Sequence, residues 1–239
     1  MATFLLSDLH LPLSPSPLRE GFLRFLAGPA RSARRVYILG DLFEYWIGDD
    51  AGLRDHEPEV KALAALVRYG VPVFLQHGNR DFMIGSRFCA TTGVRLLKDP
   101  QVVDLEGANT LLSHGDIFCT DDLEYQRWRR FSRNPLAQWL FLRLPEQRRR
   151  RIAGGLRGKS SEQRRYKPED IMDVNAGAIE AAFRKHRVAT LIHGHTHRPA
   201  EHRLEVDRKA CERIVLADWR DERMEYLRVD NSGFKRITL

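Results

Sequence analysis

The sequence has few cysteines and no long apolar run. Its three cysteines, Cys89, Cys119 and Cys211, are scattered and odd in number, which argues against a disulfide framework and favours a reducing compartment. No stretch approaches the roughly 18 apolar residues of a membrane-spanning helix. Residues 1–10 lack the basic start and the cleavage site of a signal peptide, so we expect none.

Repeats and low-complexity tracts are also absent, and the composition is ordinary for a globular protein. The 239 residues suit one domain, or one domain with a substantial insertion, and 43% hydrophobic residues suffice for a core. The net charge of +7 is concentrated, because residues 143–167 contain ten Lys and Arg against two acids. Such a basic segment suits nucleic acid, anionic lipid or a phosphorylated small molecule.

Apolar runs alternate with helical patterns over residues 1–118, which predicts a layered α/β (α+β) body. We expect strands at 2–7, 35–39, 71–76 and 110–112, and helices at 18–28 and 58–69. Residues 119–170 are helical in pattern, basic and aromatic, and are predicted to be a helical insertion or lid within a single domain of residues 1–239. Beyond it we expect a helix at 171–185, strands at 190–192 and around Val215 and Tyr226, a turn at 231–233 and a final strand.

Five short blocks of Asp, His and Asn share one design, since each follows an apolar strand-like run. The blocks are FLLSDLH at 4–10, ILGDLFE at 38–44, LQHGNRD at 75–81, LSHGD at 112–116 and LIHGHTH at 191–197. Strand ends of layered α/β proteins converge on one crevice. Because alternate residues of an extended chain point the same way, Asp8 and His10 can face one ion together. One such block is usually a cap or a turn, but five in one chain predict one site.

Carboxylate, imidazole and amide ligands suit Mn²⁺ or Fe²⁺ more than a thiolate-type zinc site. Two ions about 3.5–4 Å apart can clamp the oxygens of a phosphoryl group, and an aspartate with its two oxygens can bridge them. The blocks therefore predict a two-metal phosphoesterase.

The order of the blocks resembles that of the calcineurin-like metallophosphoesterases, whose pattern is Asp-x-His, Gly-Asp, Gly-Asn-x-Asp/Glu, His and Gly-His-x-His. The resemblance implies a four-layer sandwich of two β-sheets flanked by helices. It implies one ion held by Asp8, His10, Asp41 and His197, and another held by Asp41, Asn79, His114 and His195.

Other polar residues of the blocks are interpreted as supporting the site. Spacing alone leaves His77 and His193 open as ligands, but the family pattern makes them supporting or core histidines. Asp116, Asp81 and Glu44 are expected to orient ligands or to form local ion pairs.

Arg80 departs from the many family members that have His at this position. Arginine is a poor proton donor near neutral pH but binds phosphate oxygens with a bidentate fork. A leaving phosphate, with a pKa of about 6, needs no proton, so Arg80 favours a phosphoanhydride substrate. The alternative is that Arg80 pairs with Asp81 or another neighbour.

The most apolar segment of the chain, residues 136–144, lies between the basic and aromatic stretch WRRF at 128–131 and the basic stretch RRRR at 148–151. Three interpretations fit a helix of this kind. It can be a lid that grips an acyl chain, or an interfacial patch on an anionic membrane. It can also be a helical pair that packs its apolar stripe on the body and leaves its arginines in solvent.

A closer resemblance favours the lipid interpretations. The chain is similar to the UDP-2,3-diacylglucosamine hydrolases (pyrophosphatases) of lipid A biosynthesis. The similar stretches are 4–11, 21–27, 37–50, 78–82, 114–122, 171–175 and 191–200, and the most specific is the WIGDD sequence at 46–50. The tail beyond residue 199 adds little.

This resemblance implies a reaction and a location. Water would attack the α-phosphate of UDP-2,3-diacylglucosamine, releasing UMP and 2,3-diacylglucosamine 1-phosphate, which is lipid X. It implies two ions, most often Mn²⁺, and a cytoplasmic enzyme at the inner face of the inner membrane. Implied catalytic residues are Asp41, Asn79, Arg80 and His195, and implied substrate contacts are Asn79, Arg80, Asp122, Ser160, Arg164, Lys167 and His195. The family has Asn where this chain has Arg164.

Two other classes of function fit the sequence less well. A nuclease or dinucleotide phosphatase of the same superfamily explains the metals and the charge, but it explains the apolar segment 136–144 less well. We therefore expect no nucleic-acid partner. A scaffold that has lost its metals is disfavoured by the complete ligand set.

Overall fold

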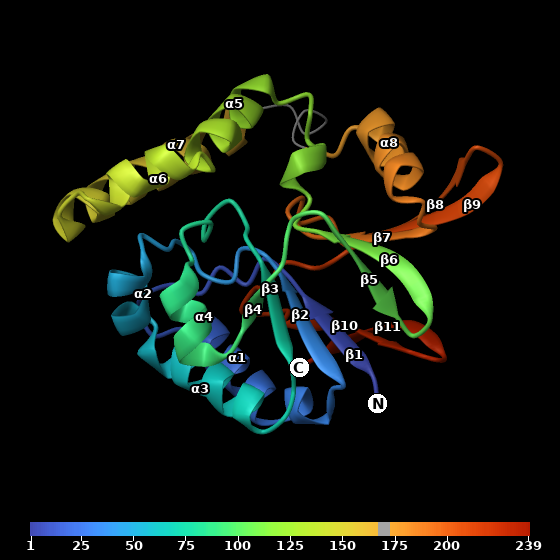
Figure 1. Ribbon diagram of the computed structural model, residues 1–239, viewed down its shortest axis with the longest axis horizontal. Coiled ribbons are helices and arrows are strands. Elements are labelled where there is room, and N and C mark those ends of the chain that lie inside the picture. Colours follow the sequence, from blue (N-terminus) through green and yellow to red (C-terminus); the bar gives the residue numbers. More distant parts are fainter. Residues whose placement is uncertain (167–172) are drawn as a thin grey trace.

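The computed structural model describes the backbone of residues 1–166 and 173–239, and the side chains of these residues except 157 and 159–166. Two β-sheets face each other, and helices cover their outer faces (Figure 1). Both chain termini lie at the same end of the body (Figure 1).

The first sheet has the strand order β11-β10-β1-β2-β3-β4. Strands β1 to β4 run parallel, whereas β10 and β11 are antiparallel to their neighbours. Its strands are β1 (Thr3–Leu6), β2 (Arg35–Leu39), β3 (Val73–Gln76), β4 (Arg95–Leu96), β10 (Glu225–Asp230) and β11 (Gly233–Thr238). The associated helices are α1 (Pro17–Ala27), η1 (Pro29–Ser32), α2 (Asp49–Asp55), α3 (Glu57–Arg68) and α4 (Ser86–Thr92).

The second sheet has the strand order β5-β6-β7-β9-β8. Its three central strands are parallel and its two edge strands are antiparallel to their neighbours. The strands are β5 (Gln101–Leu105), β6 (Ala108–Ser113), β7 (Thr190–His193), β8 (Ala200–Val206) and β9 (Lys209–Val215). The associated helices are η2 (Asp116–Phe118) and α8 (Ala176–His186).

Three apolar clusters show that these elements form four layers. The first cluster joins Leu6 of β1 to Phe22 and Phe25 of α1, on the outer face of the first sheet. The second lies between the sheets and contains Leu5 of β1. The third joins Leu111 of β6 to helix α8 on the outer face of the second sheet. Successive strand residues thus face opposite layers, and the predicted sandwich of two sheets flanked by helices is confirmed.

Three helices between the fourth and fifth predicted blocks form what we call the arm, residues 123–166. They are α5 (Leu123–Ser132), α6 (Pro135–Leu142) and α7 (Glu146–Tyr166). Asp122 and Asn134 cap the first two helices by accepting hydrogen bonds from backbone N–H groups, and Pro135 occupies the first turn of α6. Figure 1 shows the arm projecting beside the two-sheet body. The helical content predicted for residues 119–170 is thus found in the described part of this segment.

One predicted helix begins later than expected, and some strands, β8 among them, are not predicted by the sequence patterns. The helix expected at 171–185 begins only at Ala176, because the Asn175 side chain caps it by accepting from the Ala178 N–H. Strand β8 was not predicted, since its sequence AEHRLEV is largely polar; it is an exposed edge strand paired only with β9.

Within the described part of the chain, no helix is both long enough and apolar enough to cross a membrane.

Candidate metal centre

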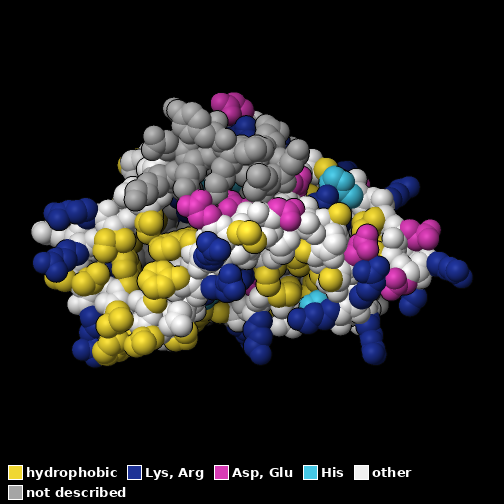
Figure 2. All heavy atoms as spheres, turned by 90° about the horizontal axis from the view of Figure 1, so that it is seen from above, with side chains coloured by type: hydrophobic (Ala, Val, Ile, Leu, Met, Phe, Trp, Pro, Cys, Tyr) yellow, Lys and Arg dark blue, Asp and Glu magenta, His cyan; other side chains and the backbone are white. Residues whose placement is uncertain are grey.

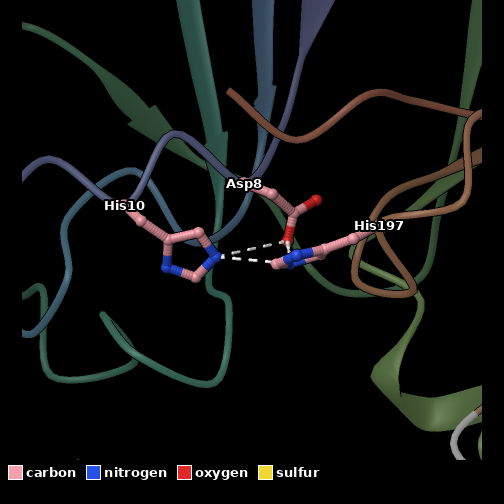
Figure 3. A group of neighbouring side chains, drawn as sticks. All are labelled: Asp8, His10 and His197. Atoms are coloured by element: carbon pink, nitrogen blue, oxygen red, sulfur yellow. Dashed lines mark hydrogen bonds and ion pairs between the residues drawn. The ribbon is translucent and has the colours of Figure 1, made fainter. Parts of the chain in front are cut away.

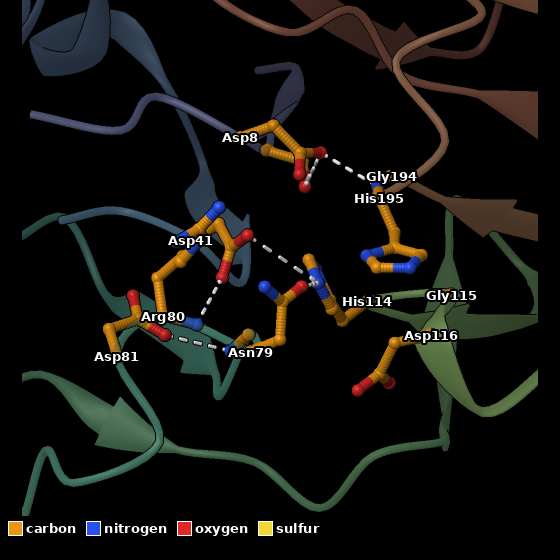
Figure 4. A network of polar contacts seen from close by, with 12 residues as sticks. Asp8, Asp41, Asn79, Arg80, Asp81, His114, Gly115, Asp116, Gly194 and His195 are labelled. Carbon is orange, nitrogen blue, oxygen red and sulfur yellow. Dashed lines mark hydrogen bonds and ion pairs between the residues drawn. The ribbon is translucent and has the colours of Figure 1, made fainter. Parts of the chain in front are cut away.

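All five blocks lie in loops at one edge of the two sheets. Strands β1, β2 and β3 are parallel in the first sheet, and β6 and β7 are parallel in the second. Each block begins in one of these strands and continues past its carboxyl end. Since the carboxyl ends of parallel strands meet at one edge, the loops bring their polar side chains together (Figure 4).

The backbone of five of the seven candidate ligands is left-handed rather than extended. The angle φ is 55° at Asp8, 47° at His10, 51° at Asp41, 70° at His195 and 56° at His197. Asp8 and His10 do face the same point, as predicted, but the predicted cause, an extended backbone, is wrong. The side chains converge because the chain turns sharply after each strand. Residues other than glycine rarely adopt this conformation, and such strain gathers at functional sites.

Asp8, His10 and His197 form one group of potential metal ligands (Figure 3). Nε2 of His197 lies 3.4 Å from Oδ1 of Asp8 and 3.4 Å from Nε2 of His10. Nε2 of His10 lies 3.9 Å from the same Asp8 oxygen. The other oxygen, Oδ2, accepts hydrogen bonds from the Ser7 hydroxyl and the His195 backbone N–H. Oδ1 of Asp8 therefore stays directed toward the two imidazoles.

Asp41 lies between this group and a second one. Its Oδ2 is 3.7 Å from Nε2 of His10 and 3.9 Å from Nε2 of His114. Its Oδ1 accepts a hydrogen bond from the Arg80 backbone N–H at 2.8 Å. Oδ1 of Asn79 lies 3.1 Å from Nε2 of His114. This central position is the one that a bridging ligand requires.

His195 completes the arrangement from the second sheet. Its ring centroid lies 4.9 Å from that of His114, and Figure 4 shows the two rings beside Asn79. Its Nδ1 is buried and has no hydrogen-bond partner in the described part of the chain. All the predicted ligands therefore surround one point, although their binding of ions stays a prediction.

Two buried oxygens test whether the residues fit divalent metal ions. Oδ1 of Asp8 and Oδ2 of Asp41 accept no hydrogen bond from any described residue. Leaving a buried acceptor unsatisfied costs about 1–3 kcal/mol, and more for a charged group. Both oxygens face imidazole nitrogens, which can also supply an electron pair to a metal ion. No thiolate is among the potential ligands. Such oxygen and nitrogen donors fit divalent cations.

The electrostatics of the site point the same way. Burial opposes protonation of His114, but Asp41, Asp8 and other nearby carboxylates together raise its pKa to about 9. Burial lowers the pKa of His10 to about 4 and raises the pKa of Asp41. Carboxylates that draw a proton onto a buried imidazole form a negative centre that a divalent cation would neutralise.

Two glycines let the loops come close together. A side chain at Gly78 would lie 2.0 Å from Oδ1 of Asp41. One at Gly194 would lie 2.1 Å from the Ser7 hydroxyl and 2.2 Å from Oδ2 of Asp8. These positions therefore need glycine for close approach to the ligands.

Several predicted supporting residues hold the ligand loops. Asp81 accepts hydrogen bonds from the backbone N–H groups of Leu42 and Gly78, both at 2.8 Å. It thereby ties the second block to the third. Glu44 lies 3.7 Å from Nδ1 of His10, on the side of the ring away from Asp8.

Asp116 links the site to the arm. It is fully buried and accepts hydrogen bonds at 2.8 Å from the Tyr125 hydroxyl and from Nε of Arg129. Arg133 lies 3.4 Å from the same oxygen. Helix α5 is therefore fixed two residues from His114.

His77 and His193 have structural partners, in agreement with their interpretation as supporting residues. Nε2 of His77 lies 2.8 Å from the Ile84 carbonyl oxygen. Nδ1 of His193 lies 2.8 Å from the Gly194 carbonyl oxygen, and its Nε2 is 3.2 Å from Arg213.

Arg80 is not engaged by the ion pair considered as its alternative role. Asp81 instead accepts from two backbone N–H groups. Nε of Arg80 is buried and has no hydrogen-bond partner among the described residues. Its guanidinium is thus available beside Asp41.

The remaining predicted substrate contacts are not tested by the structure. Asp122 caps helix α5 by accepting from the Tyr125 backbone N–H at 3.0 Å. The side chains of Ser160 and Arg164, and the whole of Lys167, lie outside the described residues.

One acidic residue near the ligands was missed by the sequence reasoning. Oδ2 of Asp218 lies 3.6 Å from Nδ1 of His197. Asp218 follows β9, which is parallel to β7, so it is at the same edge as the five blocks. The sequence does contain a signal for Asp218, because the apolar run 214–217 precedes it. A single acid after a strand is a weaker signal than the groups of Asp, His and Asn that define the five blocks.

Comparison with known proteins agrees with this geometry. The family model of the calcineurin-like phosphoesterases matches residues 1–199. A UDP-2,3-diacylglucosamine hydrolase of Aromatoleum aromaticum is 48% identical, over 98% of this chain and 95% of its own length. Proteins with the same name from Stutzerimonas stutzeri and Salmonella arizonae are 50% and 51% identical, over 96% and 93% of this chain and 95% and 92% of theirs.

The matched region contains all five blocks, and the relatives match the chain almost from end to end. The chain therefore belongs to the calcineurin-like phosphoesterase family and, within it, to the group of the UDP-2,3-diacylglucosamine hydrolases.

Proposed function

We propose that this protein hydrolyses the pyrophosphate bond of UDP-2,3-diacylglucosamine by attack of water on the α-phosphate. The products are UMP and 2,3-diacylglucosamine 1-phosphate (lipid X), an intermediate of lipid A biosynthesis. The observation that carries the proposal is the pair of buried, unsatisfied oxygens of Asp8 and Asp41 among imidazoles, in a chain about half identical to hydrolases of this name.

The ligand assignment is part of this proposal. Asp8, His10, Asp41 and His197 would hold one ion, and Asp41, Asn79, His114 and His195 the other. When bound, the two ions would supply Lewis-acid chemistry for activating water and neutralising phosphoryl charge. The mixed oxygen and nitrogen donor set without thiolate favours Mn²⁺.

Residues of the chain would bind and orient the pyrophosphate. The Arg80 guanidinium has a buried Nε without a partner among the described residues, so it can donate a fork of hydrogen bonds to phosphoryl oxygens. His195 would help to stabilise the developing charge. Asn79 would contact both ion and substrate. Asp122, Ser160, Arg164 and Lys167 are proposed as further substrate contacts.

The arm is proposed as the insertion that receives the acyl chains. Helix α6 has no buried residue, and Leu136, Trp139 and Leu140 are 64%, 50% and 54% exposed. The interpretation in which this apolar stripe packs on the body therefore holds only in part, because Phe141 packs against the first core cluster while these three side chains stay exposed. Figure 2 shows a broad hydrophobic area on the side of the molecule where the arm lies. A contiguous exposed area of this kind marks a lipid or partner surface.

Basic side chains border this area. Arg143 stacks over the Trp139 ring at 4.4 Å, and Arg148 is exposed in the first turn of α7. Aromatic residues that enter a membrane interface beside arginines that meet lipid phosphates are typical of peripheral binding. We accordingly propose that the protein works at the cytoplasmic face of the inner membrane, where its lipid substrate would lie.

Hydrolysis in ¹⁸O-labelled water tests the reaction. The purified protein is incubated with UDP-2,3-diacylglucosamine and Mn²⁺, and both products are analysed by mass spectrometry. Label in UMP is the expected result, because it reports attack on the α-phosphate. Label in the sugar phosphate would overturn the proposed position of attack. Activity on a dinucleotide or nucleic acid without release of UMP from the lipid would instead favour the nuclease or dinucleotide phosphatase alternative.

A further inference from the structure

A sixth loop reaches the metal centre beside the five predicted blocks. Strand β9 pairs in parallel with β7, so its carboxyl end lies at the edge of the sheet that carries His195 and His197. Asp218 comes three residues after the end of β9. The next residue, Trp219, donates its backbone N–H to the carbonyl oxygen of Asp8 at 3.0 Å. The loop is therefore tied directly to a candidate ligand.

The carboxylate of Asp218 is buried and held from two sides. It is 4% exposed, and it accepts hydrogen bonds from Nε of Arg220 at 2.7 Å and from Arg223 at 2.6 Å. The two arginines are joined by reciprocal backbone hydrogen bonds across a tight turn. Both are more exposed than the acid that they hold. The turn 218–223 thus fixes a negative charge at a defined point.

The imidazole of His197 lies between this fixed carboxylate and that of Asp8. Its backbone is left-handed, and its Nε2 faces Oδ1 of Asp8 at 3.4 Å. Its other ring nitrogen, Nδ1, faces Asp218 at 3.6 Å. Two other candidate ligands show a similar arrangement, since Nδ1 of His114 lies 2.9 Å from the Leu39 carbonyl oxygen and Nδ1 of His10 lies 3.7 Å from Glu44. An acceptor behind a ligating histidine fixes its tautomer and orients its free nitrogen toward the metal.

We propose that Asp218 is a positioning residue of the metal centre, which acts through His197 and is held in place by Arg220 and Arg223. The inference rests on the proposed ligand set. With Asp218 in place, Nδ1 of His197 carries the proton and Nε2 is left as the electron-pair donor. The residue touches no reacting atom, so its effect is expected first in binding of the ion that His197 shares with Asp8 and His10.

Titration of metal-free protein with Mn²⁺ tests the proposal. Binding is followed by isothermal calorimetry and by the electron paramagnetic resonance of free and bound Mn²⁺. Wild type is expected to bind two ions and to give the spectrum of a spin-coupled pair. Asp218→Asn is expected to bind one of the two about 10–100-fold more weakly, so that an uncoupled Mn²⁺ spectrum appears at low Mn²⁺.

Asp221→Asn provides the matched control, because Asp221 is an exposed acid in the same turn. It should titrate as wild type does. Asp218→Glu keeps the charge and is expected to restore part of the affinity. Melting temperatures show that the variants are folded, and if Asp218→Asn does not fold, Asp218→Glu carries the test with a smaller loss of about 3–10-fold in affinity.

Three outcomes separate this inference from the proposed function. Wild type that fails to bind two ions would overturn the ligand assignment itself. Wild type that binds two, together with folded Asp218 variants that bind both with unchanged affinity, would overturn only the role of Asp218. Selective weakening of one ion in the Asp218 variants, with the control unchanged, supports it.

Discussion

Asp41 is the residue on which both halves of the metal centre depend. Because its Oδ2 lies within 4 Å of His10 and of His114, removing it takes a donor from both proposed ions. Asp41→Ala is expected to lower kcat/KM for UDP-2,3-diacylglucosamine by more than the roughly 10–100-fold caused by losing an outer partner of a ligand. Bound metal per chain, measured by elemental analysis after dialysis, should fall with it.

Asp207→Ala is the control for this substitution, since Asp207 is an exposed acid on the second sheet that pairs only with Arg184 among the described residues. It should retain normal activity and metal content. Half of the wild-type activity in folded Asp41→Ala protein would show that the ligand assignment is incorrect.

His56 gives the fold a dependence on pH that is separate from the metal centre. Its ring packs against Phe43 with the ring centroids 4.2 Å apart, and neither ring nitrogen has a hydrogen-bond partner among the described residues. Burial lowers its pKa to about 3, from an ordinary value of 6.5. Between these values the unfolded chain binds a proton that the folded chain does not. The free energy of unfolding should therefore decrease as the pH falls through this window, by up to about 1.4 kcal/mol per pH unit.

His56→Phe removes this proton uptake, so its free energy of unfolding should depend less steeply on pH between 6.5 and 4. Urea unfolding at a series of pH values measures the slope, which is independent of any constant change in packing. His202→Gln, at an exposed position on β8, should keep nearly the wild-type slope. An equal slope in His56→Phe and wild type would contradict the assignment.

At the scale of elements, the arm is fastened to the body by ion pairs in α5 and at the start of α7. Arg129 of α5 binds Asp116. In the first turn of α7, Arg149, which is 3% exposed, pairs with Asp50 through both terminal nitrogens and donates to the Ile47 carbonyl. Asp50 belongs to the WIGDD sequence at 46–50. The structure thus gives this sequence a physical role in holding α7.

Arg149→Ala should weaken the attachment of the start of α7 to the body. Loss of a buried, hydrogen-bonded arginine is expected to lower the free energy of unfolding by about 1–3 kcal/mol. It should also speed backbone hydrogen exchange in α6 and in the first turns of α7, measured by mass spectrometry. Arg148→Ala, at the exposed neighbouring position, is the control. Exchange in α6 that is unchanged by Arg149→Ala would show that the pair does not fasten the arm.

Sequence patterns predicted the elements that follow a strong apolar period. Strand β2 occurs at the predicted residues 35–39, and α3 begins one residue before the predicted start. Strand β8 could not be found in this way, because it is a largely exposed edge strand in which only Leu204 and Val206 pack on the core, too few for a clear apolar alternation. The start of α8 is set by one capping side chain, Asn175, and periodicity alone does not specify it.

The ligands of the candidate site were predictable for a related reason, since Asp, His and Asn stand in compact groups after apolar strands. Their left-handed backbone was not, because turns after strands depend on hydrogen bonds between loops. An example is the bond from the His10 N–H to the Asp41 carbonyl oxygen. Asp218 was missed because its partner, His197, is distant in sequence and the pairing of β9 with β7 is what brings them together.

At the scale of the whole molecule, the exposed apolar face of the arm is the surface that we propose to contact lipid. Trp139→Glu combined with Leu140→Glu should weaken co-sedimentation with vesicles containing anionic phospholipid by at least about tenfold. Rising salt should weaken wild-type binding too, because the bordering arginines contribute. Metal binding should not change, since neither residue is near the ligands.

Tyr69→Glu is the control for this pair of substitutions. Tyr69 is 62% exposed, but it lies at the end of α3 on the other side of the body (Figure 1). Its vesicle binding should equal that of wild type. Equal binding by the arm variant would remove the arm from any membrane contact and leave acyl-chain binding as its remaining lipid role.

The left-handed backbone at five candidate ligands also limits how this centre can evolve. Apart from glycine, Asp, Asn and His are the residues that tolerate this conformation best, and β-branched side chains tolerate it least. Glutamate, cysteine or threonine placed at Asp8 or Asp41 would have to strain the loop before reaching an ion. The backbone conformation therefore restricts which ligand residues the site can have, and with them which metal it binds. A change of metal during evolution would require turns of another conformation after the strands.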